Sequence, residues 1–163
     1  MNEPKWRKSL AETYQKHHQM LYRIAFAYLK NAADSEDVVH DCFMKLLHEP
    51  RAFKSQEHEK AWLIVVAGNL AKDKLKESSR KNLDLDALSN YLVYKSDGDD
   101  YRDFLKLILT LPERLILPVY LYYYEGYKTA EIARILRLKP STLRNQLRDA
   151  RQILRIKLEA ENE

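Results

Sequence analysis

Apolar residues recur at intervals of three and four along most of this chain, which is the period of an α-helix with one buried face. Three helices are predicted in the first half, over residues 6–30, 35–48 and 59–80. Asp34 is the expected N-cap of the second helix, and Pro50 ends it. One small core could bury their apolar positions: Leu10, Tyr14, Met20/Leu21, Ile24, Tyr28, Val38/Val39, Cys42/Phe43, Leu46/Leu47, Trp62, Val65/Val66 and Asn69/Leu70, with Asp73 on the same stripe.

The helical period weakens over residues 81–100, which end in an acidic run. Periodicity resumes near Tyr101, and Pro112 suits the first position of a further helix that Gly126 would end with a positive φ. Pro118 should kink that helix unless the helix restarts there. The pattern predicts an all-α protein of two small helical domains, residues 1–80 and 101–163, joined by an acidic linker at 81–100.

The stretch GYKTAEIARILRLKPSTLRNQLRDAR, residues 126–151, is typical of a helix-turn-helix. Thr129 is a plausible N-cap for its first helix, and Leu138 should fill the turn. Arg137 occupies a turn position where such motifs often carry glycine. On the second helix, Leu143, Leu147, Ala150 and Leu154 form one apolar face. Another face carries side chains that can bond to base edges and phosphates: Ser141, Arg144, Asn145 and Arg148.

Charge is distributed unevenly around a modest net value of +4. Residues 126–158 hold nine Lys/Arg against two acidic residues, a local charge of +7. Residues 82–103 hold six acidic residues against two basic ones, a local charge of −4. This contrast favours a polyanionic partner for the C-terminal part only, although a basic helix face can also be merely solvated.

Composition excludes several classes of protein. A single cysteine, Cys42, cannot form an internal disulfide or a cysteine-based zinc site, and should pack as a small apolar residue. No run approaches the roughly 18 apolar residues of a membrane span, and no signal peptide is apparent, so a cytoplasmic protein without membrane insertion is expected. Glycine-rich phosphate loops and nucleophile–base sets are absent, which argues against an enzyme and against a cofactor.

Two helices carry further candidates. The second exposes Glu36, Asp37, His40 and Asp41, which could be a solvated acidic turn, a docking face for a basic protein, or a metal site. No second ligand cluster supports the metal. The third carries Trp62, Asn69, Lys72, Lys76 and Arg80, which could hold single-stranded nucleic acid or be a solvated face.

Together these segments resemble the sigma-70 family, specifically the small two-domain extracytoplasmic-function (ECF) sigma factors. DSEDVVHDCFMKLL is similar to the family's region 2.2, KAWLIVVAGNLAKDKLK to regions 2.3 and 2.4, and the segment from Leu111 to Leu154 to region 4. The likeness covers roughly residues 15–80 and 101–158. It departs from the family at His40, where glutamine is common, at Arg137, and in the run KPST.

The resemblance implies a dissociable subunit that directs core RNA polymerase to promoter DNA, with no cofactor and with an anti-sigma factor as a further partner. It assigns the clamp region of the polymerase largest subunit to Asp37, His40, Asp41 and Lys45. It assigns the unpaired −10 strand to the loop 48–59 and the helix after it, through Phe53, Lys54, Trp62, Asn69, Lys72 and Lys76. It assigns the −35 element to Thr129, Lys139, Ser141, Thr142, Arg144, Asn145 and Arg148.

Two rival interpretations remain at this point. A stand-alone helix-turn-helix regulator would explain the C-terminal domain but leave the N-terminal domain without a role. A metal-dependent enzyme using Asp37, His40 and Asp41 would require a bound metal.

Overall fold

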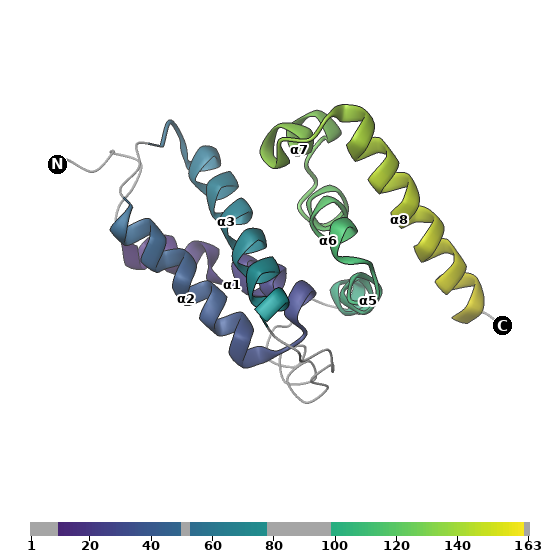
Figure 1. The fold of residues 1–163 in the computed structure, drawn as a ribbon, viewed down its shortest axis with the longest axis horizontal. Helices are drawn as coiled ribbons and strands as arrows, with labels where there is room; N and C mark the ends of the chain where they lie inside the picture. Colours follow the sequence, from purple (N-terminus) through teal and green to yellow (C-terminus); the bar gives the residue numbers. More distant parts are fainter. Residues whose placement is uncertain (1–9, 50–52, 78–98, 162–163) are drawn as a thin grey trace. The chain divides into compact units, whose positions relative to one another are not determined.

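The computed structural model describes residues 10–49, 53–77 and 99–161, all of which are helix, turn or short connection (Figure 1). Two compact units divide between Asn90 and Tyr91. The predicted all-α class with two helical domains is confirmed. The predicted linker at 81–100 lies outside the described residues except for its last two positions, where a helix has already begun.

The first unit is a bundle of three helices, α1 (Leu10–Leu29), α2 (Ala32–His48) and α3 (Gln56–Glu77) (Figure 1). Each of the three packs against the other two. Their shared core consists of large apolar side chains with at most 1% of their surface exposed: Leu21, Ile24, Phe26, Val38, Leu63 and Ile64. This core is what holds the exposed faces of α2 and α3 in a fixed arrangement.

The start of α2 corrects one prediction. Asn31, not Asp34, is the N-cap: its backbone is extended and its Oδ1 accepts a 2.9 Å hydrogen bond from the backbone N–H of Asp34. Helix α2 therefore begins three residues earlier than predicted. Asp34 lies in the first turn, where a carboxylate still interacts favourably with the helix dipole. Asn31 lies three residues before Asp34 and directly follows Lys30, whose positive φ of 56° marks the turn between α1 and α2.

The buried face of α3 also differs from the prediction. The buried positions are Glu59, Leu63, Ile64, Ala67, Gly68 and Ala71, whereas Trp62, Val65, Val66 and Leu70 are half-buried. Asn69 and Asp73, which were placed on the apolar stripe, are exposed. The error has a physical source: after Leu63 and Ile64, the buried face consists of the small residues Ala67, Gly68 and Ala71, which mark it weakly in the sequence.

Leu63 gives a direct test of this corrected core. Leu63→Ala should lower the free energy of unfolding by about 2–5 kcal/mol, because it deletes most of a fully buried side chain and leaves a cavity. Leu47→Ala on α2 is the matched control, since Leu47 is 53% exposed and should change stability by no more than about 0.5 kcal/mol. Urea unfolding followed by circular dichroism measures both. Equal effects would contradict the assigned core.

The second unit contains α5 (Asp99–Ile108), α6 (Glu113–Val119), the π-helical segment η1 (Tyr120–Tyr124), α7 (Thr129–Leu136) and α8 (Pro140–Glu161). Helix α8 packs against α6 and α7. Pro112 is the N-cap of α6 rather than its first residue. Leu115, Leu121, Ile132 and Leu143 are fully buried and join these elements into one core.

Pro118 neither breaks this helix nor starts a new one. It lies inside α6, and immediately after it the helix widens into the π-turn of η1, where the Glu125 N–H donates to the Tyr120 carbonyl over 3.1 Å. A π-turn is a recognised way to absorb a local disturbance of the hydrogen-bond ladder. Gly126 then ends the segment with φ +77°, which confirms the predicted C′ glycine.

Candidate nucleic-acid interface

The turn between α7 and α8 has the geometry expected of a helix-turn-helix. Arg137 adopts a left-handed conformation (φ 55°, ψ 47°). The N–H of Leu138 donates to the Ala133 carbonyl (2.9 Å), and that of Arg137 donates to the Arg134 carbonyl (3.3 Å). This pair of bonds is a Schellman motif, which satisfies the last carbonyls of α7. The turn therefore forms with arginine at the position where glycine was expected.

The same conformation predicts a gain in stability. Arg137→Gly should raise the free energy of unfolding by roughly 1 kcal/mol, because glycine adopts the left-handed region without a Cβ clash. Arg134→Gly is the matched control: Arg134 is also exposed but lies within α7, where glycine should cost about 1 kcal/mol. Thermal and urea unfolding of the two variants should move in opposite directions. A loss of stability in Arg137→Gly would show that its side chain makes a needed contact.

The start of α7 differs from the prediction for Thr129. Lys128 is the N-cap residue, and its backbone N–H donates to Oε1 of Glu131 over 3.0 Å. Thr129 is the first helical residue and is exposed, so its predicted capping role is wrong. Glu131 supplies the interaction instead, because a carboxylate three residues into a helix can reach back to the N-cap amide. Thr129 remains a candidate DNA contact.

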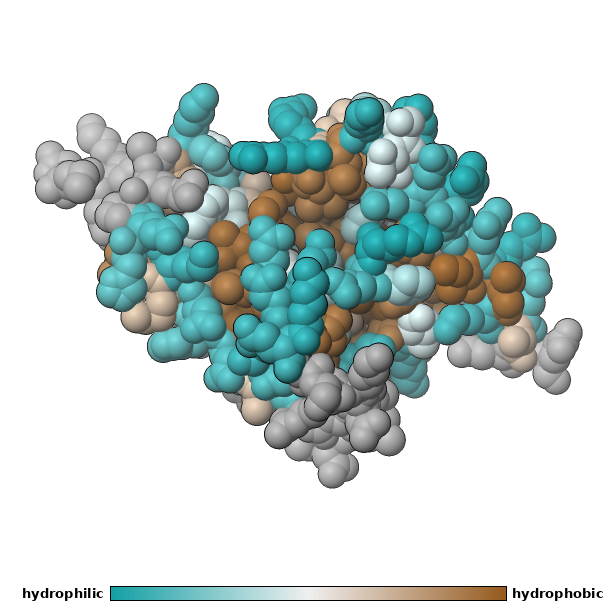
Figure 2. Space-filling model, viewed as in Figure 1, coloured by the Kyte–Doolittle hydropathy of each residue, from teal (hydrophilic) through white to brown (hydrophobic). Residues whose placement is uncertain are grey.

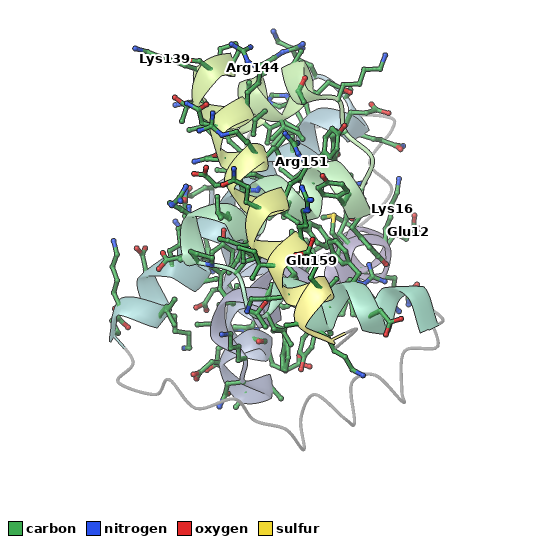
Figure 3. All side chains as sticks on the ribbon, turned by 90° about the vertical axis from the view of Figure 1, so that its right-hand side faces the viewer. Glu12, Lys16, Lys139, Arg144, Arg151 and Glu159 are labelled. Atoms are coloured by element: carbon green, nitrogen blue, oxygen red, sulfur yellow. The ribbon has the colours of Figure 1, made fainter. Side chains whose placement is uncertain are left out.

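Helix α8 carries two opposed faces. Leu143, Leu147 and Ala150 are at most 3% exposed, and Leu154 is half-buried, as the apolar pattern predicted. All seven residues predicted to contact the −35 element are exposed: Thr129, Lys139, Ser141, Thr142, Arg144, Asn145 and Arg148. In Figure 3, Lys139 and Arg144 lie at one end of α8, Arg151 near its middle and Glu159 at the other end. The helix thus presents cationic and amide side chains near its N-terminus.

An ion-pair cluster beside this face was not predicted. Oδ2 of Asp149 lies 3.2 Å from Nη2 of Arg114 on α6, and Oδ1 lies 3.8 Å from Nη2 of Arg148. The carboxylate therefore joins α6 to α8 and sits next to a candidate DNA contact. Sequence could not reveal this pairing, because 35 positions separate Arg114 from Asp149. All three side chains are at least 32% exposed, so the contribution to stability is small.

The C-terminal part of α8 is different in character. Figure 2 shows hydrophobic atoms at the surface near this end of the helix, where Ile156 is 66% exposed. Arg155 pairs with Glu159 across one turn (3.1 Å). On α8, the candidate DNA contacts Ser141, Thr142, Arg144, Asn145 and Arg148 therefore all lie in the first three turns, away from this end.

The candidate −10 surface combines residues 53–54 with one face of α3. Asn69 and Lys76 are exposed, seven residues apart, which places them on the same side of the helix. Lys72 is half-buried, and its Nζ lies 5.9 Å from the centre of the Tyr28 ring. Partial burial and the aromatic ring beneath its ammonium group restrict the positions that this lysine side chain can adopt.

The short segment before α3 places its two candidates differently. Lys54 is exposed, whereas Phe53 is only 6% exposed. The Phe53 ring packs edge-on against Trp62 (5.7 Å between centroids), and Trp62 is itself half-buried. Phe53 is thus part of the platform beneath this surface in the structure. That either ring stacks on a base stays a prediction.

The candidate polymerase surface lies on the outer side of α2. Asp37, His40, Asp41 and Lys45 are all exposed, and Asp37 forms a 3.3 Å ion pair with Lys74 of α3. Met44 (36%) and Leu47 (53%) are also exposed, although Leu47 was predicted to lie in the apolar stripe. The apolar stripe predicted for α2 covers more of the helix surface than the core buries. The surplus apolar residues add hydrophobic area to this surface.

Cys42 lies on the opposite, inner side of α2. It is fully buried, as predicted, and burial followed by the charge of Asp41 raises the pKa of its thiol to about 12. It is therefore a protonated packing residue. Among the described residues, no group of three or more His, Cys, Asp or Glu could hold a metal ion, so nothing there supports the metal-dependent enzyme. Within the same residues, no helix is long and apolar enough to cross a membrane.

Comparison with known proteins identifies the family. The family model for sigma-70 region 2 matches residues 13–81, and that for sigma-70 region 4 matches residues 101–154. The chain belongs to the sigma-70 family. Its relatives place it in the ECF group: an ECF sigma factor, SigL of Mycobacterium tuberculosis, is 26% identical over 90% of this chain and 86% of its own. The sigma factor SigV of Bacillus subtilis is 29% identical over 90% of this chain and 89% of its own.

The fold agrees with two solved structures, one of which is a sigma factor. The sigma factor RpoE of Bartonella quintana, solved in complex with the anti-sigma factor NepR, matches with a TM-score of 0.69 and 19% identity over 91% of this chain and 96% of its own. CnrH, solved with the cytosolic domain of CnrY, matches with a TM-score of 0.62 and 19% identity over 93% of this chain and 88% of its own. The three-helix unit and the helix-turn-helix unit are both part of this shared fold.

Proposed function

We propose that this protein is an ECF sigma factor, which binds core RNA polymerase and directs it to promoters through their −10 and −35 elements. One observation carries the proposal. A single chain holds region 2 and region 4 in family order, and each region has an exposed face of the chemistry its role requires. The acidic and apolar face of α2 suits a basic protein surface, and the cationic faces of α3 and α8 suit nucleic acid.

Each of the three candidate surfaces would bind a different partner. Asp37, His40, Asp41 and Lys45 of α2 would dock on the clamp region of the polymerase largest subunit. Lys54, Asn69, Lys72 and Lys76, over the platform of Phe53 and Trp62, would hold the unpaired −10 strand, because cations on its phosphates and aromatic rings under its bases suit a single strand. The exposed face of α8 would lie in the major groove of the −35 duplex.

Bipartite recognition explains why two small domains suffice. Each DNA contact alone would be weak, and holding both on one polymerase supplies the effective concentration that makes the pair selective. A subunit of this kind carries out no chemistry of its own and needs no cofactor. By likeness to RpoE, which was solved with an anti-sigma factor, we also propose that an anti-sigma factor restrains this protein and that it acts in the cytoplasm, where polymerase is found.

Footprinting with and without core polymerase distinguishes this role from that of a stand-alone helix-turn-helix regulator. We expect protection of a −10 and a −35 element only when core is present, together with a monomer by native mass. A stand-alone regulator would instead protect a palindromic site alone as a dimer, because dimeric helix-turn-helix proteins read two half-sites. Tight, specific protection without core would contradict the proposal.

A further inference from the structure

His58 connects all three residues that precede α3. Its Nδ1 accepts a 3.1 Å hydrogen bond from the backbone N–H of Lys54. Its own backbone N–H donates to Oγ of Ser55 over 3.1 Å. Its ring meets the Phe53 ring edge-on, with 5.3 Å between centroids and an interplanar angle of 87°. One side chain in the first turn of α3 thus contacts the segment through a backbone bond and a ring contact.

These contacts determine where Phe53 and Lys54 lie. Ser55 caps α3, because its Oγ accepts from His58 and its carbonyl accepts from the Glu59 N–H (3.1 Å). Phe53 is held between the edges of His58 and Trp62. The Lys54 amide is tied to the His58 ring, which leaves the Lys54 side chain exposed. The segment is therefore fixed by interactions within residues 53–62.

The His58 ring is the acceptor in its hydrogen bond with the Lys54 amide. An imidazole nitrogen that accepts a hydrogen bond carries no proton, so Nδ1 is the bare nitrogen and any ring proton lies on Nε2. An apolar ring of similar shape would keep the contact with Phe53 but could not accept from Lys54. Substitutions can therefore test the hydrogen-bond acceptor and the ring contact separately.

We propose that His58 is a positioning residue for promoter opening: by accepting the Lys54 amide it fixes residues 53–55 so that Lys54, over the Phe53–Trp62 platform, meets the unpaired −10 strand. The proposal rests on the sigma-factor function proposed above. It adds a residue whose effect is transmitted through Lys54 and Phe53 rather than through direct contact with DNA.

Two substitutions separate the acceptor from the ring. His58→Phe keeps the ring edge and removes the acceptor, whereas His58→Asn places Oδ1 near the position of Nδ1 and restores an acceptor. His18→Phe is the matched control: His18 lies on α1, its ring stacks on Tyr14, and its Nδ1 lies 3.0 Å from a backbone carbonyl of its own helix. Circular dichroism melting of each variant checks that it folds.

The probe is a fluorescein-labelled single-stranded DNA of twelve nucleotides, selected from a randomised pool by the wild-type protein bound to core polymerase. We expect His58→Phe to weaken its binding by roughly 3- to 10-fold, the effect of one net hydrogen bond, and to speed hydrogen exchange of the Lys54 amide. His58→Asn should restore both values toward wild type, and His18→Phe should change neither.

The outcomes separate this inference from the function on which it rests. If the wild-type complex selects no strand, both the inference and the sigma-factor function are overturned. If the wild type binds the strand and His58→Phe binds it equally well, the positioning role is wrong and the function stands. A His58→Asn variant as weak as His58→Phe would also overturn it, because the hydrogen-bond acceptor would then not be what matters.

Discussion

Arg144→Ala is expected to weaken use of the −35 element by about 1–3 kcal/mol, roughly 5- to 150-fold, while binding to core polymerase stays unchanged. Arg144 is exposed in the first turns of α8, on the side away from the buried face formed by Leu143 and Leu147. An arginine there can make two bonds to a guanine edge, and alanine leaves both unmade. Transcription from promoters with and without a matching −35 element measures the loss.

Arg155→Ala is the matched control for this change. Arg155 is also an exposed arginine, three turns further along α8, and its guanidinium pairs with Glu159. Removing it should alter −35 use only slightly, because DNA contacts are expected from the N-terminal part of the helix. If both substitutions reduce −35 use equally, α8 contributes general positive charge rather than a reading surface.

Asp41→Arg is expected to produce the opposite pattern. Asp41 is exposed on α2 beside Met44 and Lys45, and reversing its charge would set a cation against the basic surface proposed for the polymerase clamp. Binding to core should fall at least about tenfold, since like charges brought together at an interface cost several kcal/mol. The preference for a matching −35 element should change little, because Asp41 lies in the first unit and the −35 candidates lie in the second.

A charge reversal elsewhere provides the comparison for Asp41. Asp103 on α5 is also exposed, and Asp103→Arg should leave core binding close to wild type. Equilibrium binding of labelled protein to core polymerase measures both variants. If Arg144→Ala and Asp41→Arg lost core binding to the same degree, the division of surfaces between α2 and α8 would be wrong.

Sequence periodicity predicted the helices well where large apolar residues mark the buried side. The two faces of α8 follow from Leu143, Leu147 and Ala150, and Gly126 was identified correctly from its place after a helix. The helix-turn-helix could also be predicted despite Arg137, because the surrounding apolar positions require the turn whichever residue occupies it. A left-handed arginine costs little compared with the core that it allows to form.

Predictions failed where small residues or local hydrogen bonds decide the structure. The centre of α3 packs through Ala67, Gly68 and Ala71, which carry almost no periodic signal, so the buried stripe was placed one position away. Helix starts were misplaced at α2 and α7, where Asn31 and Lys128 are the N-cap residues in place of the predicted Asp34 and Thr129. Whether a side chain or a neighbour's carboxylate caps a helix depends on backbone angles that sequence does not supply.

The exposure of most candidate site residues could be predicted from the sequence, but the contacts that support them could not. The exposed positions of Lys76, Arg144 and Asn145 follow from helix faces, whereas Asn69 was expected on the apolar stripe and is exposed. The contacts of His58 with Phe53 and Lys54 could not be predicted, because they depend on the path of an irregular segment. The Asp149 pair with Arg114 likewise requires the tertiary packing of α6 against α8.

Transcription in vitro with purified core polymerase over a promoter library tests the central claim most directly. Adding this protein should yield transcripts from a subset of templates that share two elements at a fixed spacing, and core alone should yield none of them. Arg144→Ala should relax selection at the upstream element only. An absence of any core-dependent transcript, or selection of a single palindromic site, would contradict the account of this chain as a sigma factor.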